Sequence, residues 1–331
     1  MEAIHNNNKW NISLNSERSF WKNYLIGIFI IMPKICEKCK KGHINLRNNE
    51  SIINPLLGKC SYYKCNKEYF LRSKTIFEYN RNIPASVLYT ILKLWLIDEF
   101  NVKKITNKLE NIYNVNKIDS RFIYKFIHNN RIIISNYLRT VYALDPLAFK
   151  NAFQHIPTDE SLFTHMNGEQ TWVVGLINSE TNQIRLEIVK NRDTETLKSI
   201  ITKYVAVGNY IVTDAWNGYS FLNSPNSGYF HHIYNHGAGL FGSGADSTSR
   251  IESVWSELKM LLKKIYVSIR PQHFLYFLKE VEYRRSLKGL NELDKLKDFS
   301  NVVAIVGNGI SSDLLDENEL IGLDFETYFD D

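Results

Sequence analysis

The chain has 331 residues, 44% of them hydrophobic and 23% charged, and a formal net charge of +5 at pH 7. This length allows two or three folded modules with a sizeable core. The apolar stretch at residues 24–32 is too short for a membrane helix, which needs about 20 residues. All four cysteines lie in one short segment, which argues against a disulfide-rich secreted protein.

The charge is unevenly distributed along the chain. Residues 291–331 contain 11 acidic residues and 2 lysines, so the remainder of the chain holds the positive excess. That imbalance favours a polyanionic partner for residues 1–290. Compositional bias is an alternative source of the charge, because Asn, Lys, Ile and Tyr are abundant.

Residues 1–32 are an N-terminal extension, rich in Asn at first and apolar from Tyr24 onward. No small-residue cleavage site of a signal peptide follows the apolar run. Met32 directly precedes the cysteine segment and is a candidate alternative start of translation.

Residues 33–80 contain Cys36 and Cys39, followed after twenty residues by Cys60 and Cys65. Two cysteine pairs at this distance are typical of a zinc ribbon with a tetrahedral four-cysteine site. The second pair is wider than the usual spacing, and two disulfides are the alternative. We expect a structural Zn²⁺, because four thiolates leave no open position for a substrate.

Residues 81–145 are predicted to form three helices, at 85–98, 102–113 and 120–137. Short polar breaks between them fit a helix-turn-helix-like module whose last helix enters a DNA major groove. The same periodicity fits an ordinary helical bundle. The candidate DNA-contacting side chains of the last helix are Arg121, Tyr124, Lys125, His128, Asn129 and Arg131.

Residues 150–290 alternate between strand and helix patterns, which predicts an α/β domain. Strands are expected at 171–177, 184–189 and 210–214, with helices near 194–205 and from residue 249. Asp214 would then lie at the carboxyl end of a buried strand, where ligands bind in open α/β sheets.

Three acids in this domain stand in distinctive settings: Asp159, Asp214 and Glu252. Carboxylates from separate elements can share divalent cations, Mg²⁺ or Mn²⁺, which activate the attacking oxygen and stabilise the leaving oxygen of a phosphodiester reaction. Lys259 lies on the same helical stripe as Glu252 and is a candidate phosphate contact. Taken singly, each acid is more commonly a solvated side chain or a helix cap.

Other side chains carry weaker signals. His231, His232 and His236 invite a metal-site interpretation, but such residues near a strand end are more often structural, and Mg²⁺ prefers oxygen ligands. Aromatic residues of the same domain are candidates for stacking on nucleotides, although they usually belong to the core. They are Trp216, Tyr219 and Trp255. Residues 291–331 are expected to form an acidic tail, disordered in part.

In order and spacing, these stretches resemble transposases of the Merlin superfamily, eukaryotic cut-and-paste elements related to bacterial insertion sequences. The resemblance runs from about residue 33 to residue 287. It is carried by the four cysteines with the trailing residues 75–78, by residues 159–161, 212–219, 251–259 and 280–284, and by His231 with Asn235 and His236.

The resemblance implies a ribonuclease-H-like catalytic domain, a mixed sheet flanked by helices, preceded by the zinc ribbon and the helical module. Asp159, Asp214 and Glu252 would be the metal ligands of a DDE triad. The implied partners are DNA, as terminal inverted repeats and as target. Water would attack the phosphodiester at an element end, and the freed 3′ hydroxyl would then attack the target. A homo-oligomer on DNA and action in the nucleus are implied likewise.

Two departures from the family pattern stand out. Ser247, Thr248 and Ser249 replace a common His-Thr-Asn triplet, and Pro157 interrupts the strand expected before Asp159. Either change is compatible with a decayed, inactive copy. Two other classes stay open: a domesticated or decayed transposase that acts as a zinc-dependent DNA-binding protein without catalysis, and a repair or RNA-processing nuclease of the same fold.

Overall fold

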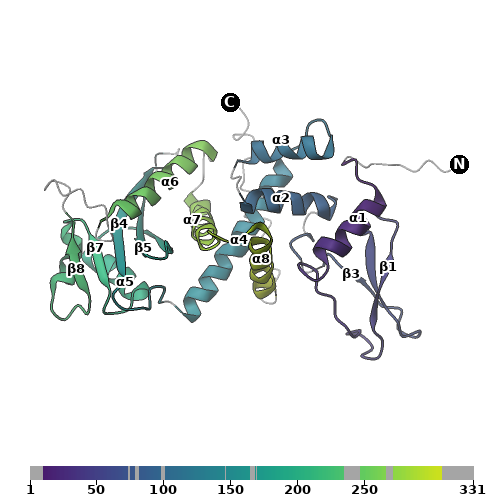
Figure 1. Ribbon diagram of the computed structural model, residues 1–331, viewed down its shortest axis with the longest axis horizontal. Helices are drawn as coiled ribbons and strands as arrows, with labels where there is room; N and C mark the ends of the chain where they lie inside the picture. Colours follow the sequence, from purple (N-terminus) through teal and green to yellow (C-terminus); the bar gives the residue numbers. More distant parts are fainter. Residues whose placement is uncertain are drawn as a thin grey trace. The chain divides into compact units, whose positions relative to one another are not determined.

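The computed structural model describes residues 10–73, 75–78, 82–97, 101–145, 147–164, 168, 170–234, 247–265 and 271–307. The chain divides into two compact units. The N-terminal unit contains the residues up to 133 and a segment that begins at residue 290, and the central unit contains residues 134–289. Helix α4 (Arg121–Leu144) runs from one unit into the other (Figure 1).

The N-terminal unit contains a small antiparallel sheet in the order β1-β2-β3. Its strands are β1 (Ile44–Asn48), β2 (Leu56–Cys60) and β3 (Glu68–Phe70). Cys60 ends β2 and pairs with Ile44 of β1, so one cysteine of the second pair is set by the register of the sheet. The predicted zinc ribbon therefore has strands from which its cysteine loops extend.

The described part of the N-terminal extension, from Trp10 onward, packs into this unit. Helix α1 (Leu14–Phe20) is capped at its start by Ser13, whose hydroxyl accepts a hydrogen bond from the Ser16 N–H. It continues into the π-helical turn η1 (Trp21–Leu25). Glu17 is buried and accepts hydrogen bonds from the Trp21 indole at 3.0 Å and from the Ser86 N–H at 3.1 Å. Because Ser86 lies at the start of α2 (Ala85–Ile97), Glu17 caps that helix from a distant part of the sequence.

Three helices pack around α2 in the N-terminal unit: α1, α3 (Val102–Tyr113) and α8 (Glu292–Gly307). The bounds of α3 are those predicted, because Asn101 caps its start and Asn114 adopts the left-handed conformation that ends it. Helix α8 lies within the predicted acidic tail and returns to this unit, where the Trp95 and Phe299 rings meet edge to face at 6.1 Å. The acidic segment thus begins with a packed helix.

Helix α4 is longer than predicted, extending to Leu144 instead of ending near Tyr137. Its apolar positions continue at Leu138 and Tyr142, both buried. Within the described residues, no helix is both long and apolar enough to cross a membrane.

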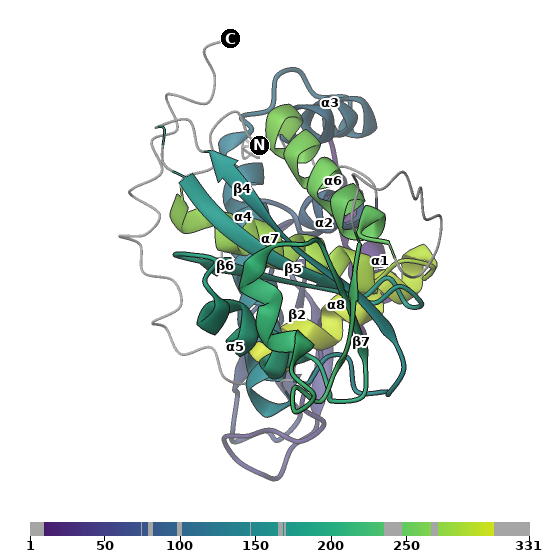
Figure 2. The same cartoon turned by 90° about the vertical axis from the view of Figure 1, so that its left-hand side faces the viewer.

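The central unit is a mixed α/β structure around a five-stranded sheet in the order β6-β5-β4-β7-β8. Figure 2 labels β4, β5, β6 and β7 of this sheet. Strands β4 (His155–Thr164), β5 (Gln170–Ile177) and β6 (Ile184–Val189) are antiparallel neighbours. Strands β7 (Tyr210–Thr213) and β8 (Phe230–Ile233) extend the sheet in parallel with β4. The mixed sheet agrees with the expected fold class.

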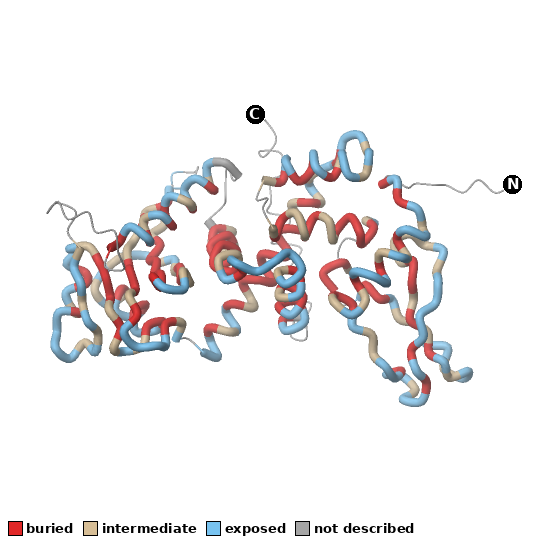
Figure 3. Tube along the Cα trace, in the orientation of Figure 1, coloured by how far each residue is buried: buried red, intermediate tan, exposed pale blue. Residues whose placement is uncertain are grey.

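Helices cover both faces of this sheet, and Figure 3 shows stretches in the buried colour along its inner strands β5, β4 and β7. Residues paired across strands share a face. Helices α6 (Ser249–Ile265) and α7 (Pro271–Ser286) contact the face that carries Asp159, through Trp255 and Phe274. Helix α5 (Thr194–Tyr204) lies on the opposite face, where the Tyr204 hydroxyl donates a hydrogen bond to Glu187. The 3₁₀ segment η2 (Asn217–Asn223) follows β7 in the chain and packs against α5.

Pro157 does not prevent the strand before Asp159. It lies inside β4 and pairs with Val212 of β7, and the antiparallel ladder to β5 begins one residue later, at Thr158. The missing N–H of the proline thus falls outside the ladder to β5, a position at which a strand tolerates proline.

Candidate catalytic site and metal centre

Asp159 and Asp214 lie on neighbouring parallel strands of the central sheet. The register pairs Pro157 with Val212, and two further residues along each strand place Asp159 beside Asp214. Asp214 directly follows the last residue of β7, as predicted from its strand-end pattern. The sheet therefore brings the first two acids to one place, at the carboxyl end of β7.

Backbone and side-chain hydrogen bonds orient the three acids. The Trp216 N–H donates to Asp214 Oδ1 at 2.9 Å, and the Trp255 indole N–H donates to Asp159 Oδ2 at 2.9 Å. The Thr248 hydroxyl donates to Glu252 Oε1 at 2.7 Å. Each carboxylate is thus held by at least one donor on its own or a neighbouring element, which restricts its rotamers.

Glu252 is brought to the site by the docking of α6. It lies in the first turn of that helix, one turn before Trp255. Trp255 crosses to Asp159 and lies over Gly175, the residue that pairs with Asp159 in β5. A Cβ atom at Gly175 would come closer than 3 Å to the Trp255 ring, so a glycine is what allows α6 to approach the sheet.

The charges of Asp214 and Glu252 both act on Asp159. Burial raises the pKa of Asp159, and the negative charges of Asp214 and Glu252 raise it further, against the Trp255 hydrogen bond. An oxygen-only set of like charges is the kind of donor set that Mg²⁺ accepts. The oxygen atoms of the three carboxylates do not lie as close to one another as the ligands of one metal ion do. Among the described residues, only the four cysteines form a group that compact.

A fourth carboxylate, Glu160, was not predicted as a site residue. It follows Asp159 in β4 and lies on the opposite face of the sheet. Burial raises its pKa to about 7, opposed by the Tyr219 hydroxyl and the charge of Arg192 and supported by the charges of Asp159 and Asp214. The only sequence signal was its adjacency to Asp159.

The remaining predicted residues of the central unit fall in several settings. Lys259 is exposed on α6, with its Nζ atom 5.5 Å from the centre of the Phe163 ring. His231 contacts the Thr213 hydroxyl at 2.9 Å and Asn223 Oδ1 at 2.7 Å, so both ring nitrogens have partners within the protein. His236 lies outside the described residues. These contacts favour the structural interpretation of His231.

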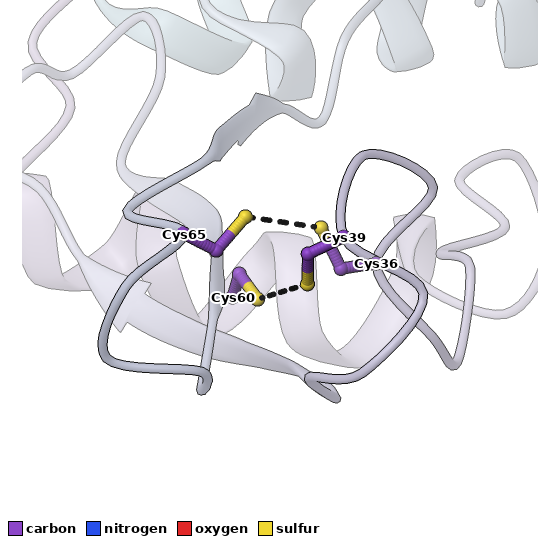
Figure 4. A group of neighbouring side chains, drawn as sticks. All are labelled: Cys36, Cys39, Cys60 and Cys65. Carbon is purple, nitrogen blue, oxygen red and sulfur yellow. Dashed lines mark hydrogen bonds between the residues drawn. The ribbon is translucent and has the colours of Figure 1, made fainter.

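The four cysteines form a compact cluster, with all four Sγ atoms within 4.8 Å of one another (Figure 4). The Cys36–Cys65 and Cys39–Cys60 sulfur pairs are each 3.6 Å apart, too far for disulfides, whose S–S bond is about 2.05 Å. Tetrahedral zinc with Zn–S bonds of about 2.3 Å requires sulfur separations of roughly 3.8 Å. The cluster therefore fits a structural Zn²⁺ site.

The surroundings of this cluster act differently on its four thiols: burial raises the pKa of Cys60 to about 12 and also raises the pKa of Cys65, whereas backbone hydrogen bonds lower the pKa of Cys39. Burial alone would raise the pKa of the Cys36 thiol, but hydrogen bonds from the Tyr69 hydroxyl and from backbone N–H groups lower it to about 6. Gly42 leaves space for the metal ligands, because a Cβ atom there would fall closer than 3 Å to Cys60 Sγ. Tyr69 is thus an outer partner that orients a ligand.

The predicted DNA-contacting residues of α4 differ in accessibility. Lys125 is exposed, and Arg121 is exposed but forms an ion pair with Asp119 at 2.7 Å. Arg131 is only 8% exposed, and His128 and Asn129 are also buried. Lys125 is therefore the side chain of this set that most readily reaches an external phosphate, and Arg131 needs a rearrangement to do so.

Residues 146–286 match the family described as the ISXO2-like transposase domain. The matched segment contains Asp159, Asp214 and Glu252, and the match supports a DDE transposase family. Membership of the Merlin superfamily is a narrower statement that this match leaves open. No curated protein matches the chain.

Two solved structures that resemble the chain are retroviral. One is the intasome of simian T-cell lymphotropic virus in complex with PP2A regulatory subunit B56 gamma, at 14% identity over 44% of this chain and 50% of that chain, with a TM-score of 0.31. The other is the HTLV-2 integrase catalytic core domain in complex with magnesium, at 11% identity over 44% and 90%, with a TM-score of 0.28. The chain thus spans about half the length of the intasome chain.

Proposed function

We propose that this protein is a transposase that cleaves DNA at transposon ends and transfers the freed 3′ hydroxyl into target DNA. The observation that carries the proposal is the placement of Asp159 on β4 and of Asp214 directly after the neighbouring parallel strand β7, with Glu252 held close by the Trp255–Asp159 hydrogen bond. This arrangement lies within the segment that matches the transposase family. It has the organisation expected of a ribonuclease-H-like DDE domain.

In this proposal Asp159, Asp214 and Glu252 hold Mg²⁺ or Mn²⁺. When bound, such ions activate the attacking oxygen and stabilise the leaving oxygen of the phosphodiester. The chain's own contribution is orientation: Trp216 fixes Asp214, Trp255 fixes Asp159 and Thr248 fixes Glu252. The raised pKa of Asp159 means that ligand binding there competes with a proton, so activity should increase as the pH rises from acid.

The remaining functional assignments follow from the same proposal. Residues 33–145 bind the terminal inverted repeats, with Zn²⁺ on the four cysteines stabilising the ribbon and with Arg121, Lys125 and Arg131 contacting DNA. Lys259 contacts a phosphate near Glu252. The protein acts as a homo-oligomer in the nucleus and belongs to the Merlin superfamily of elements.

The test is the reaction of purified protein with labelled DNA from the ends of its own genomic locus, with Mg²⁺ or Mn²⁺ and with a chelator. Asp214→Asn removes a metal ligand, and we expect it to lower cleavage at least about 100-fold while DNA binding stays within about twofold of wild type. Glu180→Gln is the control, because Glu180 is an exposed acid of the same unit. Normal cleavage by Asp214→Asn would reject the triad.

A second candidate is a DNA-binding protein without catalysis. The observation that favours it concerns the two candidate metal sites: the four cysteines lie close enough together to bind one ion, whereas Asp159, Asp214 and Glu252 do not form such a group. Retention of end DNA that decreases with salt, with no metal-dependent cleavage by the wild-type protein, would establish this alternative.

A further inference from the structure

A stack of two indoles and one guanidinium lies beside Asp214. The Arg192 guanidinium carbon is 4.1 Å from the centre of the Trp216 ring and 4.5 Å from that of Trp172. The Trp216 indole N–H also donates to the Arg192 carbonyl at 3.4 Å. Arg192 thus lies against two aromatic rings at the end of the sheet where the acids gather.

Two features distinguish this stack from core packing. Trp216 is 41% exposed, whereas Tyr219 and Trp255 are only 1% and 5% exposed. The guanidinium of Arg192 makes no hydrogen bond or ion pair with any residue in the described part of the chain. The charge of this planar cation acts on the buried Glu160, but its five N–H donors have no hydrogen-bond acceptor among the described residues and can bind an external one.

The local backbone fixes the stack next to the site. Trp216 is two residues after Asp214, and its own N–H donates to Asp214 Oδ1 at 2.9 Å. A Cβ atom at Gly218 would come closer than 3 Å to the Nε1 and Cδ1 atoms of Trp216, so the glycine lets the pyrrole edge of the indole approach η2. A ligand that contacts Trp216 therefore lies next to Asp214.

The chemistry of the stack matches a nucleotide. Aromatic rings bind bases by stacking with little sequence preference, and arginine binds phosphate through paired N–H groups. An exposed indole and an available guanidinium on the same support offer both contacts at once. A base can reach them only when it has left the duplex stack.

We propose that Trp216 and Arg192 bind an unpaired nucleotide of the DNA strand beside the scissile phosphate, with the base on the exposed surface of Trp216 and the phosphate on Arg192. This inference rests on the proposed function for its position next to the reacting phosphate. The stacking itself needs no cleavage and is tested separately.

The experiment measures binding of the full-length protein, by fluorescence anisotropy, to a labelled duplex with a short oligo-dT extension and to the same duplex with blunt ends. Ca²⁺ replaces Mg²⁺ so that no cleavage occurs. We expect the wild type to prefer the extended DNA about tenfold, which is a typical effect of one stacked base. Trp216→Ala should lose the preference, Trp216→Phe should keep most of it, and Arg192→Lys should reduce it because lysine cannot lie flat between two rings.

The control is Phe153→Ala, because Phe153 is an exposed aromatic residue of the same unit, stacked on Phe230. An unchanged preference in Trp216→Ala, or an equal loss in Phe153→Ala, would overturn the inference. So would a wild-type protein that binds both DNAs equally. Cleavage of element ends with Mg²⁺, measured on the same preparations, separates the two claims: a preference without cleavage rejects only the proposed function, and cleavage without a preference rejects only the nucleotide site.

Discussion

Gly175 and Trp255 determine how closely α6 approaches the sheet, and so where Glu252 lies. We expect Gly175→Ala to lower the free energy of unfolding by about 1–3 kcal/mol, because the added methyl group overlaps the Trp255 ring in a packed interface. Cleavage should decrease as well, since displacement of α6 moves Glu252 and strains the Trp255–Asp159 hydrogen bond. Urea unfolding and the cleavage assay measure the two effects.

A double-mutant cycle controls for other consequences of this substitution. Trp255→Phe provides space for the added methyl group but loses the indole donor to Asp159. The double variant should therefore be more stable than the sum of the two single changes predicts. Strictly additive costs would show that the methyl group added at position 175 does not interact with Trp255.

Glu17 is a buried carboxylate whose titration should be visible in the stability of the protein. Burial raises its pKa, against hydrogen bonds from Ser86 and Trp21 and the charge of Arg72. The folded state therefore holds the proton more tightly than the unfolded state, and stability decreases as the pH rises from about 4.5 to the raised pKa. Glu17→Gln cannot ionise but keeps an oxygen acceptor, so its free energy of unfolding should decrease less over that range.

The measurement is urea unfolding of both proteins across the acid range. Glu50→Gln is the matched control in the same unit, because the side chain of Glu50 is 87% exposed. Parallel stability profiles for the wild type and Glu17→Gln would contradict the burial argument.

At the scale of elements, local patterns predicted α3 and β6 with their observed bounds. Both carry their own signals: an Asn cap at each end of α3, and alternating apolar residues in β6. Helix α8 was not predicted from the sequence, because the acidic residues of the segment dominated its interpretation as a tail. The buried apolar residues of α8 nevertheless recur at helical spacing. They are Leu296, Phe299, Val302, Val303 and Val306.

In the candidate site, too, features that depend on neighbouring residues in the sequence could be predicted, and contacts between distant residues could not. Asp214 was predictable because a strand pattern ends directly before it. The hydrogen bond between Trp255 and Asp159 joins residues 96 positions apart, and no local pattern encodes it. Glu160 and Arg192 were missed for the same reason, since their importance comes from neighbours on other elements.

The packing of α8 on α2 can be tested by one pair of substitutions. Phe299 is fully buried against Trp95, and Ile305 of the same helix is 55% exposed. Phe299→Ala should lower the free energy of unfolding of the N-terminal unit by about 3–5 kcal/mol, as is usual for a large buried aromatic residue. Ile305→Ala should change it by less than about 0.5 kcal/mol. Equal small effects would mean that α8 is not docked in solution.

At the scale of the whole molecule, the chain leaves the N-terminal unit through α4, forms the central unit, and returns at residue 290. The cysteines belong to one unit, and Asp159, Asp214 and Glu252 to the other. Because zinc binding and folding of a ribbon are coupled, we expect zinc removal to unfold the ribbon locally. Each unit has its own core, so the central sheet should keep its structure.

Amide hydrogen exchange measures this separation directly. After treatment with a zinc chelator, or in Cys39→Ser, β2 should lose protection while β4 and β7 keep theirs, since exchange reports the stability of each cooperative segment. Tyr63→Ala is the control, because Tyr63 is an exposed ribbon residue next to the cluster. Zinc retained at full stoichiometry by Cys39→Ser would reject the four-cysteine site. Equal loss of protection in β2 and β4 would instead show that the two units fold as one, and the zinc would then stabilise the carboxylate site as well as the ribbon.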